Sequence, residues 1–183
     1  MIKWLVIETS SLCFGYGRVS SEIPGALEAS RAQDAQTFYT WLSAYFQPTA
    51  NDRIASREEL QKSPMLTSPC PTISKLSADE ACAMLEPAAL VSSRGARILE
   101  TSHGVLEQNF RRTFLDGVSV LPNVDVVLLC GTHTLWQCKW AIRCVEDLLK
   151  EPPVGERRRS VSFVTLQGGN HFVSCLCAFK KKL

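Results

Sequence analysis

The chain has 183 residues, of which 45% are apolar and 21% are charged, and its formal net charge is +2. This is ordinary usage for one globular domain, so the composition excludes a wholly disordered or fibrous protein. The basic excess is concentrated in residues 157–159 and 180–182, and neither cluster is interleaved with aromatic residues. We interpret the clusters as a solvated connection and a charged tail, and we expect no nucleic-acid partner.

The sequence opens with a short apolar run at residues 2–7, which is compatible with a strand. Glycines and a proline follow, so residues 1–25 are predicted to be irregular apart from that strand. The run is too short for a secretory signal or a membrane span. We therefore expect an intracellular, cytoplasmic protein with no membrane partner.

Residues 26–114 are predicted to be a helical region. Aromatic and apolar residues recur there at intervals of three and four, which predicts one apolar helix face. The residues of this face are Phe38, Trp41, Leu42, Tyr45 and Phe46. We interpret the face as core-covering, and a ligand-binding aromatic surface is the alternative. The connection at residues 48–76 is rich in Pro and Ser, with one short helix predicted at residues 56–62.

Two further helices are predicted before residue 115. Ser77 and Glu80 form a capping box, which predicts a helix that runs to Leu85 and ends before Pro87. The next helix is expected over residues 104–114. Its inward positions are predicted to be Val105, Leu106, Phe110 and Phe114, and its outward positions Arg111 and Arg112.

Residues 115–174 carry the clearest pattern in the chain. The apolar run at residues 124–130 suits a strand buried on both faces, residues 134–149 form an amphipathic helix, and residues 161–166 return as a second strand. In the helix, Lys139 is expected to point away from the core. A right-handed crossover would make the two strands parallel neighbours, so we predict an α/β fold. Residues 175–183 form a basic tail.

The eight cysteines do not predict disulfides. Four of them lie within apolar patterns, which buried free thiols explain better than a secreted disulfide framework. These are Cys82, Cys130, Cys138 and Cys144. No C-x-x-C motif occurs, and the cysteine and histidine spacings are not those of a zinc site. We expect no metal and no cofactor.

A histidine follows the second strand at once, in the stretch Gly168-Gly169-Asn170-His171-Phe172. At the carboxyl end of a strand, an imidazole can be aimed across the top of the sheet as a general base. Gly168 and Gly169 permit a tight turn, and Asn170 tolerates unusual backbone dihedrals. His171 is therefore our candidate base, and a histidine that only caps the strand end beside a glycine turn is the alternative. The three residues before it are candidate turn formers.

This end of the chain resembles the C-terminal part of the fungal α/β-hydrolase-fold proteins. The resemblance rests on Leu129-Cys130-Gly131-x-x-x-Leu135-Trp136, on Trp140 in the following helix, and on the Gly-x-Asn-His-Phe turn. It implies an α/β-hydrolase fold with residues 26–114 as a cap-like helical region. It also implies His171 as the last triad member, and hydrolysis of ester or related acyl or C–X bonds of a small molecule as the parental activity.

Two parts of the family pattern are missing. No G-x-S-x-G elbow occurs, so the nucleophile is unknown, and a Cys13–His171 dyad is one alternative. The glycine after the first strand is followed by Thr132-His133-Thr134 where the family usually has an aspartate. We therefore predict that no carboxylate orients His171, and Asp116, Glu107 and Glu100 are the first residues to inspect for a partner that would contradict this.

Three hypotheses follow. The first is a truncated α/β-hydrolase-family protein that is not catalytic by itself and associates with itself or a partner through an exposed sheet edge. The second is a small hydrolase with an unrecognised nucleophile. The third is a non-enzymatic helical binding module whose contact surface is the aromatic face near Trp41. The sequence does not identify a substrate.

Overall fold

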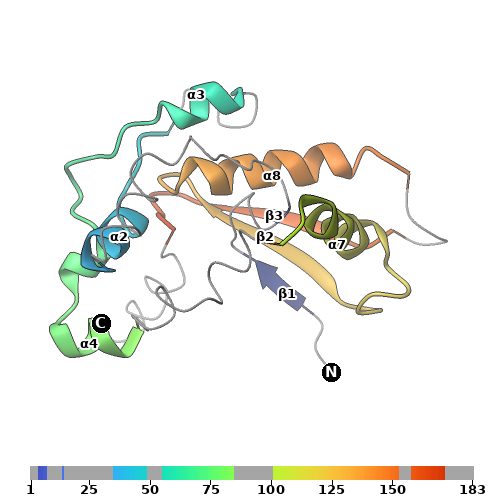
Figure 1. The fold of residues 1–183 in the computed structure, drawn as a ribbon, viewed down its shortest axis with the longest axis horizontal. Coiled ribbons are helices and arrows are strands. Elements are labelled where there is room, and N and C mark those ends of the chain that lie inside the picture. Colours follow the sequence, from blue (N-terminus) through green and yellow to red (C-terminus); the bar gives the residue numbers. More distant parts are fainter. Residues whose placement is uncertain are drawn as a thin grey trace.

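The computed structural model describes residues 4–7, 14, 35–48, 55–84, 101–152 and 158–171. Figure 1 shows the course of the chain. The elements are β1 (Trp4–Ile7), α2 (Ala35–Leu42), α3 (Arg57–Gln61), the 3-10 helix η2 (Thr72–Lys75), α4 (Ala78–Met84), α7 (His103–Leu115), β2 (Asp125–Gly131), α8 (Trp136–Leu148) and β3 (Val161–Leu166).

The strands form one parallel sheet in the order β1-β2-β3. Val127 of β2 pairs with Val6 on one side and with Ser162 on the other. The predicted parallel strand-helix-strand unit is confirmed, because α8 connects β2 to its neighbour β3. The expected burial of β2 on both faces is wrong, because buried residues alternate along it with half-buried ones. The short strand expected at residues 2–7 is present as β1 and adds a third strand. The described part of the chain is therefore mixed α/β.

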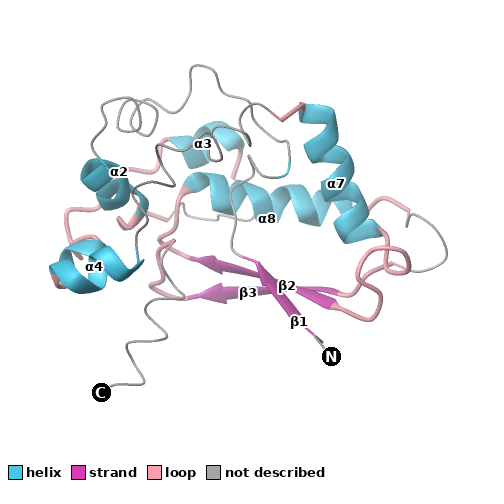
Figure 2. Cartoon of the chain, turned by 60° about the horizontal axis from the view of Figure 1, so that its bottom comes forward, coloured by secondary structure: helices cyan, strands magenta, loops and turns pink. Residues whose placement is uncertain are grey.

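The core lies between the sheet and two helices, α7 and α8, which lie on the same side of the sheet (Figure 2). Phe110 and Phe114 of α7 pack in one cluster with Val126 and Leu128 of β2 and Val145 of α8. Full burial of side chains of this size contributes roughly 1.5–3 kcal/mol each. Helix α7 thus shares the core of the sheet, although it comes from the region predicted to be cap-like.

Two helix starts agree with the sequence prediction. The Ser56 hydroxyl accepts from the backbone N–H of Glu59 at the start of α3, and the Glu59 carboxylate accepts from the backbone N–H of Ser56. The two bonds form a capping box. The hydroxyl of Ser77 accepts from Glu80 N at 3.3 Å, and Ser77 N donates to the Glu80 carboxylate at 3.0 Å. This is the predicted capping box at the start of α4. Leu85 and Pro87, at the predicted helix end, lie outside the described residues.

The predicted aromatic helix face is wrong beyond Leu42. Tyr45 and Phe46 are buried, but they follow α2 in an extended segment. The backbone N–H of Phe46 donates to His133 O at 2.9 Å, and Phe46 forms an antiparallel bridge with Met65. These non-local bonds replace the next helical turn. Phe38 lies on α2, and the part of the predicted helix before residue 35 lies outside the described residues.

Two orientation predictions are also wrong. Val105, predicted to face inward, is 47% exposed near the start of α7. Lys139, predicted to face outward, is 5% exposed. It lines the hollow between α8 and the carboxyl ends of β2 and β3. Helix α8 is therefore buried over a wider part of its surface than the apolar pattern predicted.

The sequence predicted that Arg159 lies in a solvated connection, and this is wrong. It is 5% exposed, and its guanidinium donates to five backbone carbonyls. The acceptors are the carbonyl oxygens of Thr113, Asp116, Val120, Leu121 and Val124. The loop that it holds contains Leu121 at φ +45°, a conformation that costs a side-chain-bearing residue roughly 1–2 kcal/mol. Arg159 therefore fixes the entry into β2.

Buried free thiols are confirmed at three of the four predicted positions. Cys130, Cys138 and Cys144 are buried and are not in disulfides, whereas Cys70 is exposed and also not in a disulfide. The side chain of Cys82 lies outside the described residues. At these three buried positions, cysteine serves as a small side chain of the protein interior.

Candidate functional site

The end of β2 and the turn that follows β3 meet at a close backbone contact. A Cβ on Gly131 would lie 2.2 Å from the carbonyl oxygen of Gly169, so only glycine fits there. The backbone N–H of His133 donates to that same oxygen at 2.8 Å. The turn after β3 is thereby fixed against the end of β2.

Gly168 forms the bend of this turn. Its φ is +72°, which glycine adopts without strain, and nothing lies within 4 Å of a Cβ built there. Its backbone N–H donates to the Thr132 hydroxyl at 2.9 Å. Thr132, at the position where the resemblance led us to expect an acid, therefore holds the turn.

Asn170 joins the sheet to the α2 and η2 region. It is fully buried, and its Nδ2 donates to Ser43 O at 2.5 Å and to Thr72 Oγ1 at 2.7 Å. The backbone N–H groups of Thr72 and Ile73 bind Ser43 in turn. Positive φ among the described side-chain-bearing residues occurs at Leu121 and Asn123, so Asn170 acts through its amide and not through an unusual dihedral.

His171 is half-buried at the carboxyl end of the sheet, where its Nδ1 lies 3.3 Å from Cys138 Sγ. Cys138 is the third residue of α8 and is 2% exposed. It belongs to an apolar cluster with Ala44, Phe46 and Leu135. The structure thus pairs the candidate base with a buried thiol. The first turn of a crossover helix lies at the same sheet edge as the end of the next strand. The proximity of Cys138 to His171 could therefore have been predicted from the sequence.

Asp116 and Glu107, the two candidate acids within the described ranges, do not take the orienting place. Asp116 ends α7, before β2 begins, and its carboxylate accepts from the backbone N–H groups of Val118 and Ser119 at 3.0 and 2.7 Å. These bonds hold the pKa of Asp116 below its usual range. The length of β2, roughly 20 Å, separates it from the edge where His171 lies. Glu107 is exposed on α7, and Glu100 lies outside the described residues.

His133, the other histidine at this edge, contacts a backbone carbonyl through its ring. Its ring Nδ1 lies 2.9 Å from Phe46 O, while its own carbonyl accepts from Phe46 N at 2.9 Å. The two contacts bind residue 46 to the end of β2. Cys13, the partner in the alternative dyad, lies outside the described residues.

Cys144 is the other thiol of the helix. Burial, with a smaller contribution from the Asp147 carboxylate, raises its pKa to about 12. A thiol with this pKa stays protonated at neutral pH and is a poor nucleophile. Cys144 therefore provides an inert reference for Cys138.

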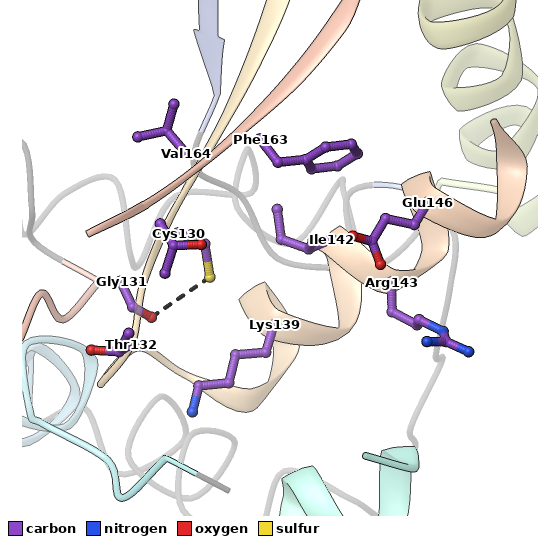
Figure 3. Close-up of a pocket in the computed structure, with 10 residues that line it drawn as sticks. Cys130, Gly131, Thr132, Lys139, Ile142, Arg143, Glu146, Phe163 and Val164 are labelled. Atoms are coloured by element: carbon purple, nitrogen blue, oxygen red, sulfur yellow. Dashed lines mark hydrogen bonds between the residues drawn. The ribbon is translucent and has the colours of Figure 1, made fainter. Parts of the chain in front are cut away.

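A hollow of about 60 Å³ lies between α8 and the ends of β2 and β3. Its lining side chains are drawn in Figure 3. It is far smaller than the roughly 300–1,000 Å³ of most small-molecule sites. Its lining residues are Cys130, Gly131, Thr132, Lys139, Ile142, Arg143, Glu146, Phe163, Val164 and Thr165. Neither His171 nor Cys138 lines it, so this hollow does not join the candidate base to a substrate cavity.

Searches for similar proteins return no match among family models, curated proteins or solved structures. Within the described ranges, no group of three or more His, Cys, Asp and Glu side chains could hold a metal ion. None of the helices in the described ranges is both long and apolar enough to cross a bilayer.

Proposed function

We propose that the chain is an α/β-hydrolase-type scaffold in which His171 stands at the general-base position, and that it does not itself turn over esters. The parental activity would be hydrolysis of ester or related acyl bonds of a small molecule. Support comes from the parallel strand-helix-strand unit that ends in the histidine turn. The observation that carries the proposal is the 3.3 Å contact between His171 Nδ1 and Cys138 Sγ.

Whether His171 can act as a general base in ester hydrolysis depends on the group that faces its Nδ1. In a Ser-His-Asp triad, the Nδ1–H group donates to a carboxylate, which fixes the tautomer and stabilises the imidazolium formed during the reaction. A thiol is a weak hydrogen-bonding partner and supplies no negative charge while protonated. Neutralising the triad acid costs about 10⁴-fold in turnover. With Cys138 beside Nδ1, we expect ester hydrolysis at background level.

A thiol-dependent hydrolase is the second candidate, and the same contact favours it. Cys138 lies in the first turn of α8, where the helix dipole favours a thiolate. Nδ1 of His171 would take the thiol proton, and sulfur would attack the substrate carbonyl carbon. The alcohol would leave with that proton, and water would then hydrolyse the thioester and restore the thiol. Because Cys138 is 2% exposed, this route requires Phe46 and Leu135, which pack in the same apolar cluster, to move aside and admit a substrate.

Alkylation of the native chain separates the two candidates. Iodoacetamide at pH 8, followed by peptide mass mapping, should label exposed Cys70 and leave Cys138 and Cys144 unmodified. Labelling of Cys138 faster than Cys70, lost in His171→Ala, would support the thiol hydrolase instead. A fluorophosphonate probe should leave every serine unlabelled, and a labelled serine would contradict both candidates.

A further inference from the structure

Strand β3 ends the sheet on the side away from β1 within the described part of the chain. Its sequence, VSFVTL, contains no charge, no proline and no glycine. Edge strands of soluble proteins normally carry charges, prolines or bulges that prevent pairing with another chain. Short uncharged segments of high β propensity pair readily when they lie at such an edge. As far as the described residues go, β3 is therefore an unprotected edge.

The hydrogen bonds to β2 define which backbone groups of β3 remain on the outside. The carbonyls of Ser160 and Leu166 accept from Val126 N and Thr132 N, each at 3.0 Å. Backbone groups alternate sides along a strand, so the intervening odd-numbered residues present their N–H and C=O groups to the open edge. These residues are Val161, Phe163 and Thr165.

We propose that β3 pairs antiparallel with β3 of a second copy, across a two-fold axis at Phe163. Phe163 would then face Phe163 of the second copy, and Val161 would face its Thr165. Residues with outward N–H and C=O groups form the hydrogen-bonded pairs of an antiparallel ladder, so this register gives about six hydrogen bonds. Two three-stranded sheets would join into one continuous sheet.

The occupant is a second copy because the edge is self-complementary. A two-fold axis at the middle of the strand matches every outward donor with an acceptor of the same strand. On the face away from α8, Val164 is 41% exposed beside half-buried Leu129 and Leu166, so pairing also extends an apolar surface. A net charge of +2 opposes self-association little. A single strand pair makes a small interface, so we expect a dissociation constant in the micromolar range or weaker.

Sedimentation equilibrium of the full chain from about 5 to about 500 µM tests this pairing. We expect the wild-type mass to rise from monomer to dimer, and Val164→Lys to remain monomeric because its two lysines would lie diagonally across the ladder. Val105→Lys is the matched control, since Val105 is 47% exposed on α7 and away from the edge. It should dimerise like the wild type. Circular dichroism should show the same fold for all three.

Amide hydrogen exchange of the wild type provides a readout that does not depend on a variant. The peptide covering residues 161–166 should become more protected as concentration rises, while α7 stays unchanged. A monomer at all concentrations, equal weakening by Val105→Lys, assemblies larger than a dimer, or no concentration dependence at β3 would each overturn the proposal.

Discussion

Gly131 and Gly169 approach so closely that a Cβ on the first would lie 2.2 Å from the carbonyl oxygen of the second. Both sides of this contact are backbone, so no side-chain rotation can relieve it. Gly131→Ala should therefore lower the free energy of unfolding by at least about 2 kcal/mol. Gly104→Ala is the control, because its nearest atom would be 3.9 Å away within helix α7. Urea unfolding measures both, and equal midpoints would contradict the close contact.

The buried amide of Asn170 should be essential to the link between the sheet and residues 43 and 72. Asn170→Ala removes both bonds donated by Nδ2, while Ser43 O keeps its bond from Thr72 N, so we expect a loss of about 1–3 kcal/mol. Asn170→Asp should cost more, because a carboxylate oxygen would face the Ser43 carbonyl. Exposed Asn109→Ala is the control. Thermal unfolding that ranks Asp above Ala in stability would show that another group holds the link.

Arg159 should tolerate no conservative replacement. Lysine has three donors on one point charge, so Arg159→Lys would leave several of the five carbonyls without a partner. We expect a loss of about 2–4 kcal/mol, against no measurable change in Arg112→Lys on the exposed side of α7. Chemical denaturation of the two variants checks this. Equal stability would mean that the loop before β2 holds its shape without the guanidinium.

The raised pKa of Cys144 should make the free energy of unfolding depend on pH in the alkaline range. Its folded pKa of about 12 lies above that of an unfolded thiol, so the unfolded state loses this proton first. The contribution to stability is therefore complete below pH ~9 and is lost as the pH rises toward about 12. Cys144→Ala should lose part of this alkaline slope when unfolding is followed by fluorescence from pH 8 upward. An unchanged slope would contradict the raised pKa.

The local pattern predicted most of the α/β unit, since alternating strands, an amphipathic helix and capping boxes depend on neighbouring residues. The contacts that build the site are non-local. Asn170 reaches Ser43 across most of the chain, and His171 meets a thiol on the preceding helix. Arg159 resembles solvated charge in the sequence because its acceptors are carbonyls, which carry no residue signature. Periodicity alone also extended α2 to Phe46, where bonds to His133 replace the helix.

The central claim is that His171 faces Cys138 through Nδ1 and does not act as an ester-hydrolysing base. Hydrolysis of p-nitrophenyl acetate by the purified full chain tests it most directly, with His171→Ala and Cys138→Ala measured beside the wild type. We expect the same near-background rate for all three proteins. Turnover in the wild type that falls at least tenfold in His171→Ala would contradict it.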